Sequence, residues 1–198
     1  MIKAVVFDLG GVLVDNPTAG MRSYCAKLLG VAEEEFDNVT SECIPVFQKG
    51  LITEKEFWKR VMDQLGVARS IKASIWKKAL EQAYSPKEEM FSLVSGLKRK
   101  GLKAGLLSNT ELPVVEFLQD KDYSMFDIKV FSCLEKTRKP EKRIYQLVLE
   151  RLGTRPEETV FIDDNKENVI AAEELGLIGI LFEDIKQINR ELDRILTI

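Results

Sequence analysis

The sequence predicts an α/β fold with a doubly wound parallel sheet and a small all-helical domain inserted after the first strand. Three observations predict this class. Short apolar segments recur along the chain, the stretches between most of them have helical spacing, and residues 17–84 have helical spacing alone. Segments that are short, apolar on both faces and bounded by turn residues are typical of buried parallel strands rather than half-exposed hairpins. The sequence therefore favours a βαβ series with right-handed connections.

Five segments are the predicted strands. In chain order they are IKAVVFD (2–8), LKAGLLS (102–108), IKVFS (128–132), TVFID (159–163) and IGILF (178–182). Three stretches between them predict helices, at 86–101, 139–153 and 165–176, because each has apolar residues at helical spacing and a glycine at its end. The first two also have a proline near the start, where the fixed φ of proline suits a first helical turn.

Residues 17–84 interrupt this alternation. They predict four amphipathic helices, at about 18–29, 32–47, 53–65 and 70–83, separated by turn sequences. Thr53 and Glu56 form a capping-box pattern at the start of the third helix. The aromatic residues expected to form the small core of this segment are Phe47, Phe57, Trp58 and Trp76. The predicted domains are a core of residues 1–16 and 85–198 and a helical cap of residues 17–84.

The composition excludes several classes of protein. With 45% hydrophobic and 31% charged residues among 198, the chain has an ordinary globular composition, which excludes a disordered or coiled-coil protein. The net charge of -3 gives no electrostatic reason to bind nucleic acid or an anionic membrane. No apolar segment is long enough to span a membrane and the N-terminus lacks a signal-peptide pattern, so we expect a cytoplasmic protein.

The chain has no histidine, and its three cysteines, Cys25, Cys43 and Cys133, are widely spaced. The absence of histidine excludes triad hydrolases, histidine-ligated metal sites and histidine phosphotransfer. The cysteines form no CxxC pair, so we expect buried thiols rather than a disulfide framework or a thiolate zinc site. Acid, base or metal chemistry must therefore use carboxylates, lysines and hydroxyls.

Polar residues follow the predicted strands at the edge where ligands bind in an open parallel sheet. These residues are Asp8, Ser108, Asn109, Asp163 and Asp164, and Lys139 begins the helix after the third strand. Three converging carboxylates repel one another, and a divalent cation would remove that repulsion. Oxygen ligands without histidine or cysteine favour a hard ion, and a site that also holds waters and a substrate phosphate favours Mg²⁺.

These segments resemble the motifs of the haloacid dehalogenase superfamily, whose hydrolases form an aspartyl-phosphate. The matching segments are FDLGGVLVD, LLSNT, RKPEKRIY and FIDDNKENVIAAEELG. They occur in the family's order and cover essentially the whole chain, so the sequence is identified as a member with a Rossmann-like core and a helical cap of the C1 type.

The resemblance implies roles for the acidic residues. Asp8 would be the nucleophile, attacking phosphorus through one oxygen while the other binds magnesium. The carbonyl of Gly10 would be a second metal ligand and Asp164 the second carboxylate ligand. Asp163 would be a nearby ligand that acts directly or through water.

The resemblance also implies a phosphate-binding set. Ser108 and the backbone of Asn109 would hold the phosphoryl oxygens. Lys139 would neutralise charge shared by Asp8 and the phosphate, so that electrostatic stabilisation of phosphoryl transfer would come from one lysine and one metal ion.

Gly10 departs from the family pattern. Most phosphatases of the superfamily have a second aspartate there, which protonates the leaving oxygen and later activates water. Three interpretations remain open. The first, which we favour, is a magnesium-dependent phosphatase whose substrate needs little protonation, such as a sugar 1-phosphate, an acyl phosphate or an aryl phosphate. The others are a 2-haloacid dehalogenase, whose halide leaves unprotonated, and a non-catalytic protein that binds or senses a phosphorylated metabolite.

A helical cap that closes over the sheet edge excludes water, which suits a small phosphorylated metabolite better than a protein surface. The cap sequence does not specify which metabolite, and the oligomeric state is not predicted.

Overall fold

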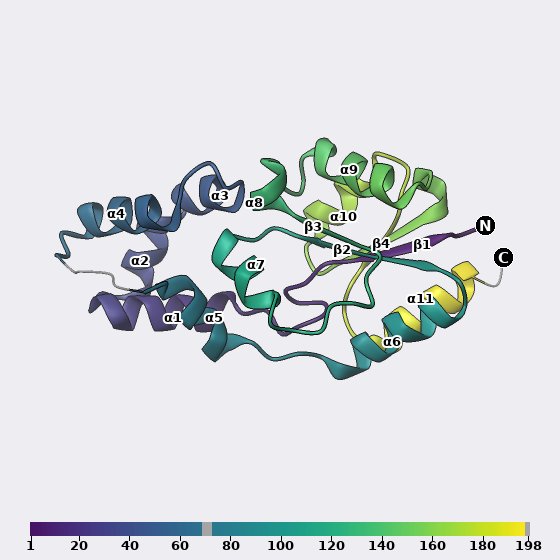
Figure 1. The fold of residues 1–198 in the computed structure, drawn as a ribbon, viewed down its shortest axis with the longest axis horizontal. Helices are drawn as coiled ribbons and strands as arrows, with labels where there is room; N and C mark the ends of the chain where they lie inside the picture. Colours follow the sequence, from purple (N-terminus) through teal and green to yellow (C-terminus); the bar gives the residue numbers. More distant parts are fainter. Residues whose placement is uncertain (69–72, 197–198) are drawn as a thin grey trace.

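The computed structural model describes residues 1–68 and 73–196 and contains a five-stranded sheet with helices on both sides (Figure 1). The strands are β1 (Ala4–Phe7), β2 (Lys103–Ser108), β3 (Ile128–Phe131), β4 (Thr159–Asp163) and β5 (Ile178–Leu181). Their order in the sheet is β3-β2-β1-β4-β5, and all neighbouring pairs are parallel. The predicted doubly wound parallel sheet is confirmed.

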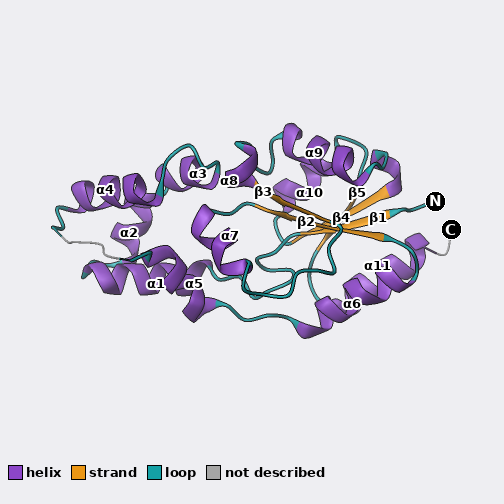
Figure 2. Ribbon diagram, in the orientation of Figure 1, coloured by secondary structure: helices purple, strands orange, loops and turns teal. Residues whose placement is uncertain are grey.

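Two pairs of helices cover the two faces of the sheet (Figure 2). The helices α9 (Lys142–Leu152) and α10 (Lys166–Glu173) lie on one face, and α6 (Glu88–Arg99) and α11 (Ile185–Leu196) lie on the other. Side chains alternate between the two faces along a strand. In β1, Val6 therefore packs in the apolar cluster that includes α9 and α10, and Val5 and Phe7 pack in the cluster that includes α6 and α11. The central strand β1 is therefore buried on both faces.

Three short elements join this framework: α7 (Leu112–Leu118) after β2, α8 (Ser132–Glu135) after β3 and the 3-10 helix η1 (Pro156–Glu158) before β4. No helix was predicted from the sequence at these segments or at α11, and Ser132, the first residue of α8, was expected to end the third strand.

The helices between β1 and α6 lie together beyond the carboxyl ends of the strands (Figure 1). They are α1 (Thr18–Leu29), α2 (Glu33–Thr40), α3 (Cys43–Gln48), α4 (Glu54–Leu65) and α5 (Ile75–Ala83), and we call them the helical lobe. The predicted capping box at the start of α4 is present. The aromatic residues expected to form its core are buried and in ring contact: Phe47, Phe57, Trp58 and Trp76. Residues 70–72 of the last predicted helix lie outside the described residues.

The single helix predicted at 32–47 is wrong, because α2 ends at Thr40 and α3 begins at Cys43. Proline has no N–H, so Pro45 in a continuous helix would remove a backbone hydrogen bond, and its ring would clash with the preceding turn. In α3, Pro45 lies in the first turn, where an N–H needs no helical acceptor. The hydroxyl of Thr40 donates to the carbonyl of Phe36 at 2.8 Å at the end of α2.

The two chain segments that connect the helical lobe to the rest of the molecule pair with each other. The N–H of Asp15 donates to the carbonyl of Ser85 at 2.8 Å, and the N–H of Lys87 donates to the carbonyl of Leu13 at 2.9 Å. These crossings lie next to the predicted domain boundaries. One apolar cluster contains residues from both parts, and the division into a core domain and a cap domain stays a prediction.

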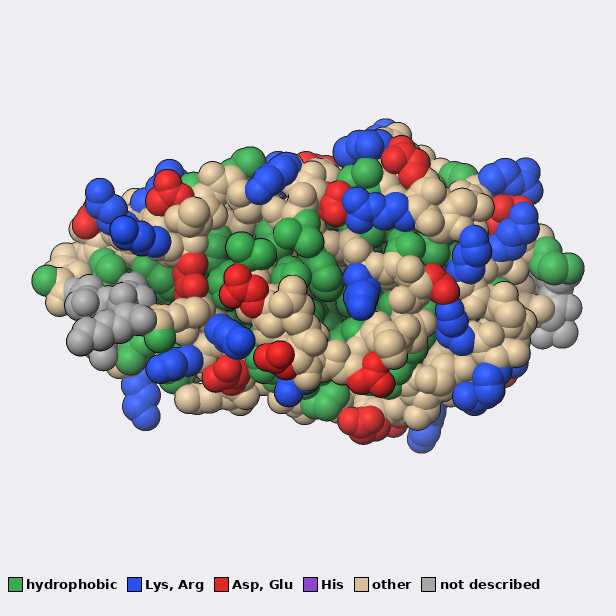
Figure 3. All heavy atoms as spheres, viewed as in Figure 1, with side chains coloured by type: hydrophobic (Ala, Val, Ile, Leu, Met, Phe, Trp, Pro, Cys, Tyr) green, Lys and Arg blue, Asp and Glu red, His purple; other side chains and the backbone are tan. Residues whose placement is uncertain are grey.

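The surface carries no concentration of one charge on the face shown in Figure 3, where basic and acidic side chains are interspersed. Apolar side chains gather near the middle of this face, where it is hollowed (Figure 3). Among the helices of the described residues, none is long and apolar enough to cross a membrane.

Candidate active site

The turn after β1 brings two carboxylates together across a glycine. The N–H of Asp8 continues the sheet by donating to the carbonyl of Ile162 in β4 at 2.9 Å. Gly11, three residues later, has a φ of +85°, and a Cβ atom there would lie 1.9 Å from Oδ2 of Asp164. The bare backbone at Gly11 is therefore required both by its left-handed conformation and by the close approach of Asp164.

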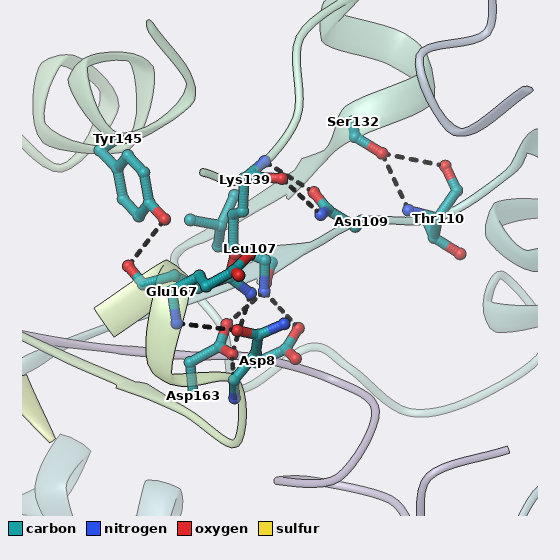
Figure 4. Close-up of polar contacts among 11 residues, drawn as sticks. Asp8, Leu107, Asn109, Thr110, Ser132, Lys139, Tyr145, Asp163 and Glu167 are labelled. Carbon is teal, nitrogen blue, oxygen red and sulfur yellow. Dashed lines mark hydrogen bonds and ion pairs between the residues drawn. The ribbon is translucent and has the colours of Figure 1, made fainter. Parts of the chain in front are cut away.

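An acidic cluster lies at the carboxyl ends of β1 and β4. Asp8, Asp163 and Asp164 each offer a carboxylate oxygen, and these oxygens lie within 4.8 Å of one another. The ammonium group of Lys139 lies between two of them, 2.7 Å from Oδ1 of Asp8 and 2.6 Å from Oδ2 of Asp163 (Figure 4). It also donates to the carbonyl of Leu107 at 3.2 Å. The single cation is shared by two buried carboxylates.

Asp163 is completely buried, and both of its oxygens accept hydrogen bonds from the protein. Besides Lys139, its donors are the N–H of Asn165 at 2.8 Å and the side-chain amide of Asn168 at 3.0 Å. The hydroxyl of Tyr145 donates to the carbonyl of Asn168 at 2.9 Å. Asp163 thus lies behind Lys139, whereas Asp8 and Asp164 line a cavity.

Asn109, just after β2, holds the backbone of Lys139. Its amide nitrogen donates to the carbonyl of Lys139 at 2.9 Å, and its amide oxygen accepts from the N–H of Lys139 at 2.8 Å (Figure 4). Ser108, the last residue of β2, lines the same cavity as Asp8. Among the described residues, none is hydrogen-bonded to the Ser108 hydroxyl, which leaves it available to a ligand.

Burial controls the electrostatics of the cluster. Burial raises the pKa of Asp8 to about 7, although Lys139 lowers it, and the neighbouring charge of Asp163 raises it further. Burial and the charge of Asp163 also raise the pKa of Asp164. Burial by itself would lower the pKa of Lys139, but Asp8 and Asp163 raise it above its ordinary value. The cluster holds more negative than positive charge and would be stabilised by a further cation.

The residues around this cluster fit a magnesium ion. Asp8, Gly10 and Asp164 line one cavity, which gives it two carboxylates and a backbone carbonyl. Oxygen donors of this kind are those of a hard divalent cation, and the surplus negative charge of the cluster needs one.

The same cavity extends from the strand ends into the helical lobe. Its volume is about 310 Å³, and its polar part contains Asp8, Ser108, Asn109, Lys139 and Asp164. All the residues proposed from the sequence therefore lie around one cavity, except that Asp163 is buried behind it.

A family model for haloacid dehalogenase-like hydrolases matches residues 2–176. The chain belongs to this family. It is 32% identical over 185 residues to a sesquiterpene phosphatase of Aspergillus oryzae, covering 92% of this chain and 90% of that one. It is 28% identical to a phosphorylated carbohydrates phosphatase of Thermotoga maritima, over 89% of this chain and 82% of that one. The chain spans only 19% to 39% of four longer relatives.

The solved structures include a haloacid dehalogenase family enzyme of Bacteroides thetaiotaomicron in complex with magnesium and inorganic phosphate. Its TM-score with this chain is 0.79 at 27% identity, over 95% of this chain and 99% of that one. This haloacid dehalogenase-like hydrolase thus shares its whole fold with an enzyme whose structure contains magnesium and inorganic phosphate.

In this haloacid dehalogenase-like hydrolase, several residues around the cavity were missed by sequence reasoning. Glu111, directly after the SNT segment, accepts a hydrogen bond at 2.8 Å from the indole nitrogen of Trp76 in the helical lobe. The hydroxyl of Ser132 donates to the carbonyl of Gln48 at 2.6 Å and accepts from the N–H of Thr110 at 2.8 Å. The only sequence signal was position: Glu111 lies three residues after the end of β2, and Ser132 directly follows β3.

The helical lobe of the hydrolase makes a second polar contact near Ser132. Lys136 donates to the carbonyl of Gly50 at 2.6 Å, and Lys49 forms an ion pair with Glu141. A Cβ atom at Gly50 would lie 2.3 Å from the carbonyl oxygen of Cys133, so the loop after α3 packs tightly on α8. These contacts hold the lobe over the strand ends.

Proposed function

We propose that the protein is a magnesium-dependent phosphomonoester hydrolase that acts on a small phosphorylated metabolite through an aspartyl-phosphate on Asp8. The observation that carries the proposal is the position of Asp8, 2.7 Å from the ammonium group of Lys139 and in a cavity shared with Asp164. Two phosphatases among the relatives, and a structural neighbour with bound magnesium and phosphate, support it.

Asp8 supplies the nucleophile. One of its oxygens attacks phosphorus as the bond from phosphorus to the leaving oxygen breaks, and the alcohol departs with a proton from solvent. Water then attacks the same phosphorus, which returns the carboxylate and releases inorganic phosphate. Lys139 offsets the negative charge that Asp8 and the phosphoryl group share.

The remaining residues bind and orient. Ser108 and the backbone of Asn109 hold phosphoryl oxygens, and the side chain of Asn109 fixes the backbone of Lys139. Asp8, the carbonyl of Gly10 and Asp164 would hold Mg²⁺. Asp163, which the sequence suggested as a further ligand, is completely buried with both oxygens hydrogen-bonded to protein, so it would act by holding Lys139 instead. When bound, the ion would draw charge from the phosphoryl oxygens.

Gly10 supplies no proton donor, which favours a leaving oxygen that needs little protonation. Sugar 1-phosphates are candidates for that reason, and a phosphatase of phosphorylated carbohydrates is among the relatives. The second candidate function is a non-catalytic protein that binds or senses a phosphorylated metabolite, because Gly10 removes the usual general acid; a 2-haloacid dehalogenase is the third. A cytoplasmic location is part of the proposal.

The test is a screen of phosphorylated metabolites and aryl phosphates with magnesium, in excess EDTA, and with Asp8→Asn as the control. We expect turnover that EDTA abolishes and that Asp8→Asn lacks. Full turnover of phosphates in EDTA would contradict the magnesium dependence. No turnover of any phosphate, together with release of halide from 2-chloropropionate, would favour the dehalogenase. Binding of phosphate analogues without turnover of any compound would favour the non-catalytic protein.

A further inference from the structure

The wall of the cavity that faces the polar part is apolar. It is formed by Phe36, Ile44, Trp76, Leu80, Val114 and Leu118, which we call the apolar wall. Four of these residues come from the helical lobe and two from α7, so the wall spans both sides of the cavity. All but Ile44 are buried, with at most 7% of their surface exposed. These side chains lie beyond the phosphate-binding residues, where the alcohol part of a substrate would be.

Most polar side chains beside the apolar wall already have partners in the protein. Arg22 pairs with Asp37 at 2.6 Å, and the hydroxyl of Thr40 donates to the backbone of its own helix. Glu111 accepts from the indole of Trp76. These groups offer little hydrogen bonding to a substrate.

Gln48 is the exception on this side of the cavity. Its side chain lies beside the carboxylate of Glu111, whose pKa it lowers. In the part of the chain that the structure describes, Oε1 of Gln48 and Nε of Arg138 are the buried side-chain atoms without a hydrogen-bond partner, and only Gln48 lines the cavity. This side of the cavity therefore provides one free buried acceptor, Oε1 of Gln48.

We propose that the substrate is a small phosphomonoester whose alcohol part is mainly apolar and packs on the apolar wall. The inference rests on the proposed function and narrows its substrate class away from the sugar 1-phosphates named above. A sugar would place several hydroxyls against the apolar wall, beside which Gln48 offers the one free buried acceptor. Each hydroxyl that loses its water without gaining a new partner would lower the affinity about fivefold or more. The volume of about 310 Å³ lies at the lower end for small-molecule sites, which limits the alcohol part to a compact group.

The first test compares aryl phosphates of nearly equal leaving-group acidity. Phenyl, para-methylphenyl, para-ethylphenyl and para-propylphenyl phosphate differ mainly in apolar surface, so chemistry is held constant. With magnesium present we expect kcat/KM to rise about fourfold for each carbon that the wall buries, until the cavity is filled. A flat or falling series would overturn the inference, while turnover of phenyl phosphate that needs magnesium would leave the proposed function intact.

The second test measures binding without turnover. Asp8→Asn protein with magnesium is titrated calorimetrically with para-propylphenyl phosphate and with glucose 1-phosphate. We expect the aryl phosphate to bind at least tenfold more tightly, and tighter binding of the sugar phosphate would overturn the inference. Because this readout needs no catalysis, the preference would be measurable even if the wild-type protein proved inactive and the proposed function failed.

Leu80→Ala and Leu29→Ala form a matched pair of variants for the wall. Leu80 and Leu29 both belong to the helical lobe and are buried in the same apolar cluster, with 3% and 6% of their surface exposed, but only Leu80 lines the cavity. Leu80→Ala should shift the best aryl phosphate to a longer para substituent, whereas Leu29→Ala should leave the order unchanged. Equal selectivity in both variants would show that the wall does not contact the substrate. If Leu80→Ala fails to fold, Leu118→Ala at the opposite side gives the same readout.

Discussion

The side chain of Asn109 makes two hydrogen bonds to the backbone of Lys139, donating to its carbonyl at 2.9 Å and accepting from its N–H at 2.8 Å. The two residues are 30 positions apart in the chain, so this contact ties the loop after β2 to the start of the segment that carries Lys139. The ammonium group of Lys139 is in turn held between two carboxylates. Its position therefore depends on Asn109.

We predict that Asn109→Ala displaces Lys139 and lowers kcat on the order of 100-fold, the effect of a small displacement of a catalytic group. KM should change much less, because Lys139 acts on charge that develops during phosphoryl transfer. Asn38→Ala, at an exposed position in α2, is the control. Steady-state kinetics on an aryl phosphate checks the prediction, and an unchanged kcat would show that Lys139 is positioned without Asn109.

The parallel sheet could be predicted from the sequence because its strands are apolar on both faces. The same pattern placed Asp8, Ser108 and Asp163 at the carboxyl ends of neighbouring strands, where parallel pairing brings them together. The place of Lys139 came only from the family resemblance, since nothing local distinguishes it from a solvated lysine at the start of a helix.

Other features could not be predicted because they depend on how distant segments pack. The bonds from Trp76 to Glu111 and from Ser132 to Gln48 join segments 35 and 84 residues apart. The helix α11, in contrast, could have been predicted, because its apolar residues Ile188 and Leu192 have helical spacing. The division of 32–47 into two helices could also have been predicted, because Pro45 would disrupt the interior of one continuous helix.

A second prediction concerns Glu111 and pH. Burial raises its pKa to about 6, although the hydrogen bond from Trp76 lowers it. A carboxyl whose pKa is higher in the folded state than in the unfolded state binds protons more tightly when the protein is folded. Its contribution to stability is therefore complete below about pH 4.5 and is lost as the pH rises through about 6. Glu111→Gln keeps an acceptor for Trp76 and removes the buried charge, so it should raise the free energy of unfolding at pH 8 by about 2 kcal/mol.

Urea unfolding of metal-free protein at pH 4 and pH 8 measures this effect. The gain from Glu111→Gln should be present at pH 8 and largely absent at pH 4. Glu116→Gln, which changes an exposed carboxyl on the helix α7, should not change the free energy of unfolding at either pH. A loss of stability at pH 8 would mean that the charged form of Glu111 is favoured by its surroundings.

A third prediction separates the two adjacent glycines after β1. A Cβ atom at Gly10 would make only an ordinary contact, 3.4 Å from Cδ of Pro17, whereas one at Gly11 would overlap the carboxylate of Asp164 at 1.9 Å. Gly10→Ala should therefore retain magnesium binding. Gly11→Ala should weaken it at least tenfold, and its left-handed backbone should also lower the free energy of unfolding by about 1–2 kcal/mol.

Calorimetric titration with magnesium chloride and thermal unfolding in EDTA compare these two variants. Equal magnesium affinity in both would show that Asp164 does not need its present position to bind the ion. If Gly11→Ala does not fold, its failure beside a folded Gly10→Ala protein still distinguishes the two sites.

The last prediction concerns the proton that Gly10 cannot supply. Without a general acid, the rate of the first chemical step depends steeply on how well the leaving oxygen carries negative charge. Across aryl phosphates with equal para substituent size, log kcat/KM should fall sharply as the leaving-group pKa rises. Because the structure leaves room for a side chain at residue 10, Gly10→Asp places a carboxyl beside Asp8 in the cavity and should flatten this dependence. Gly10→Asn, of the same size but without a transferable proton, is the matched control and should keep the steep dependence. A flat dependence in the native protein, with the absence of a burst showing that the first chemical step limits turnover, would mean that another residue already donates the proton.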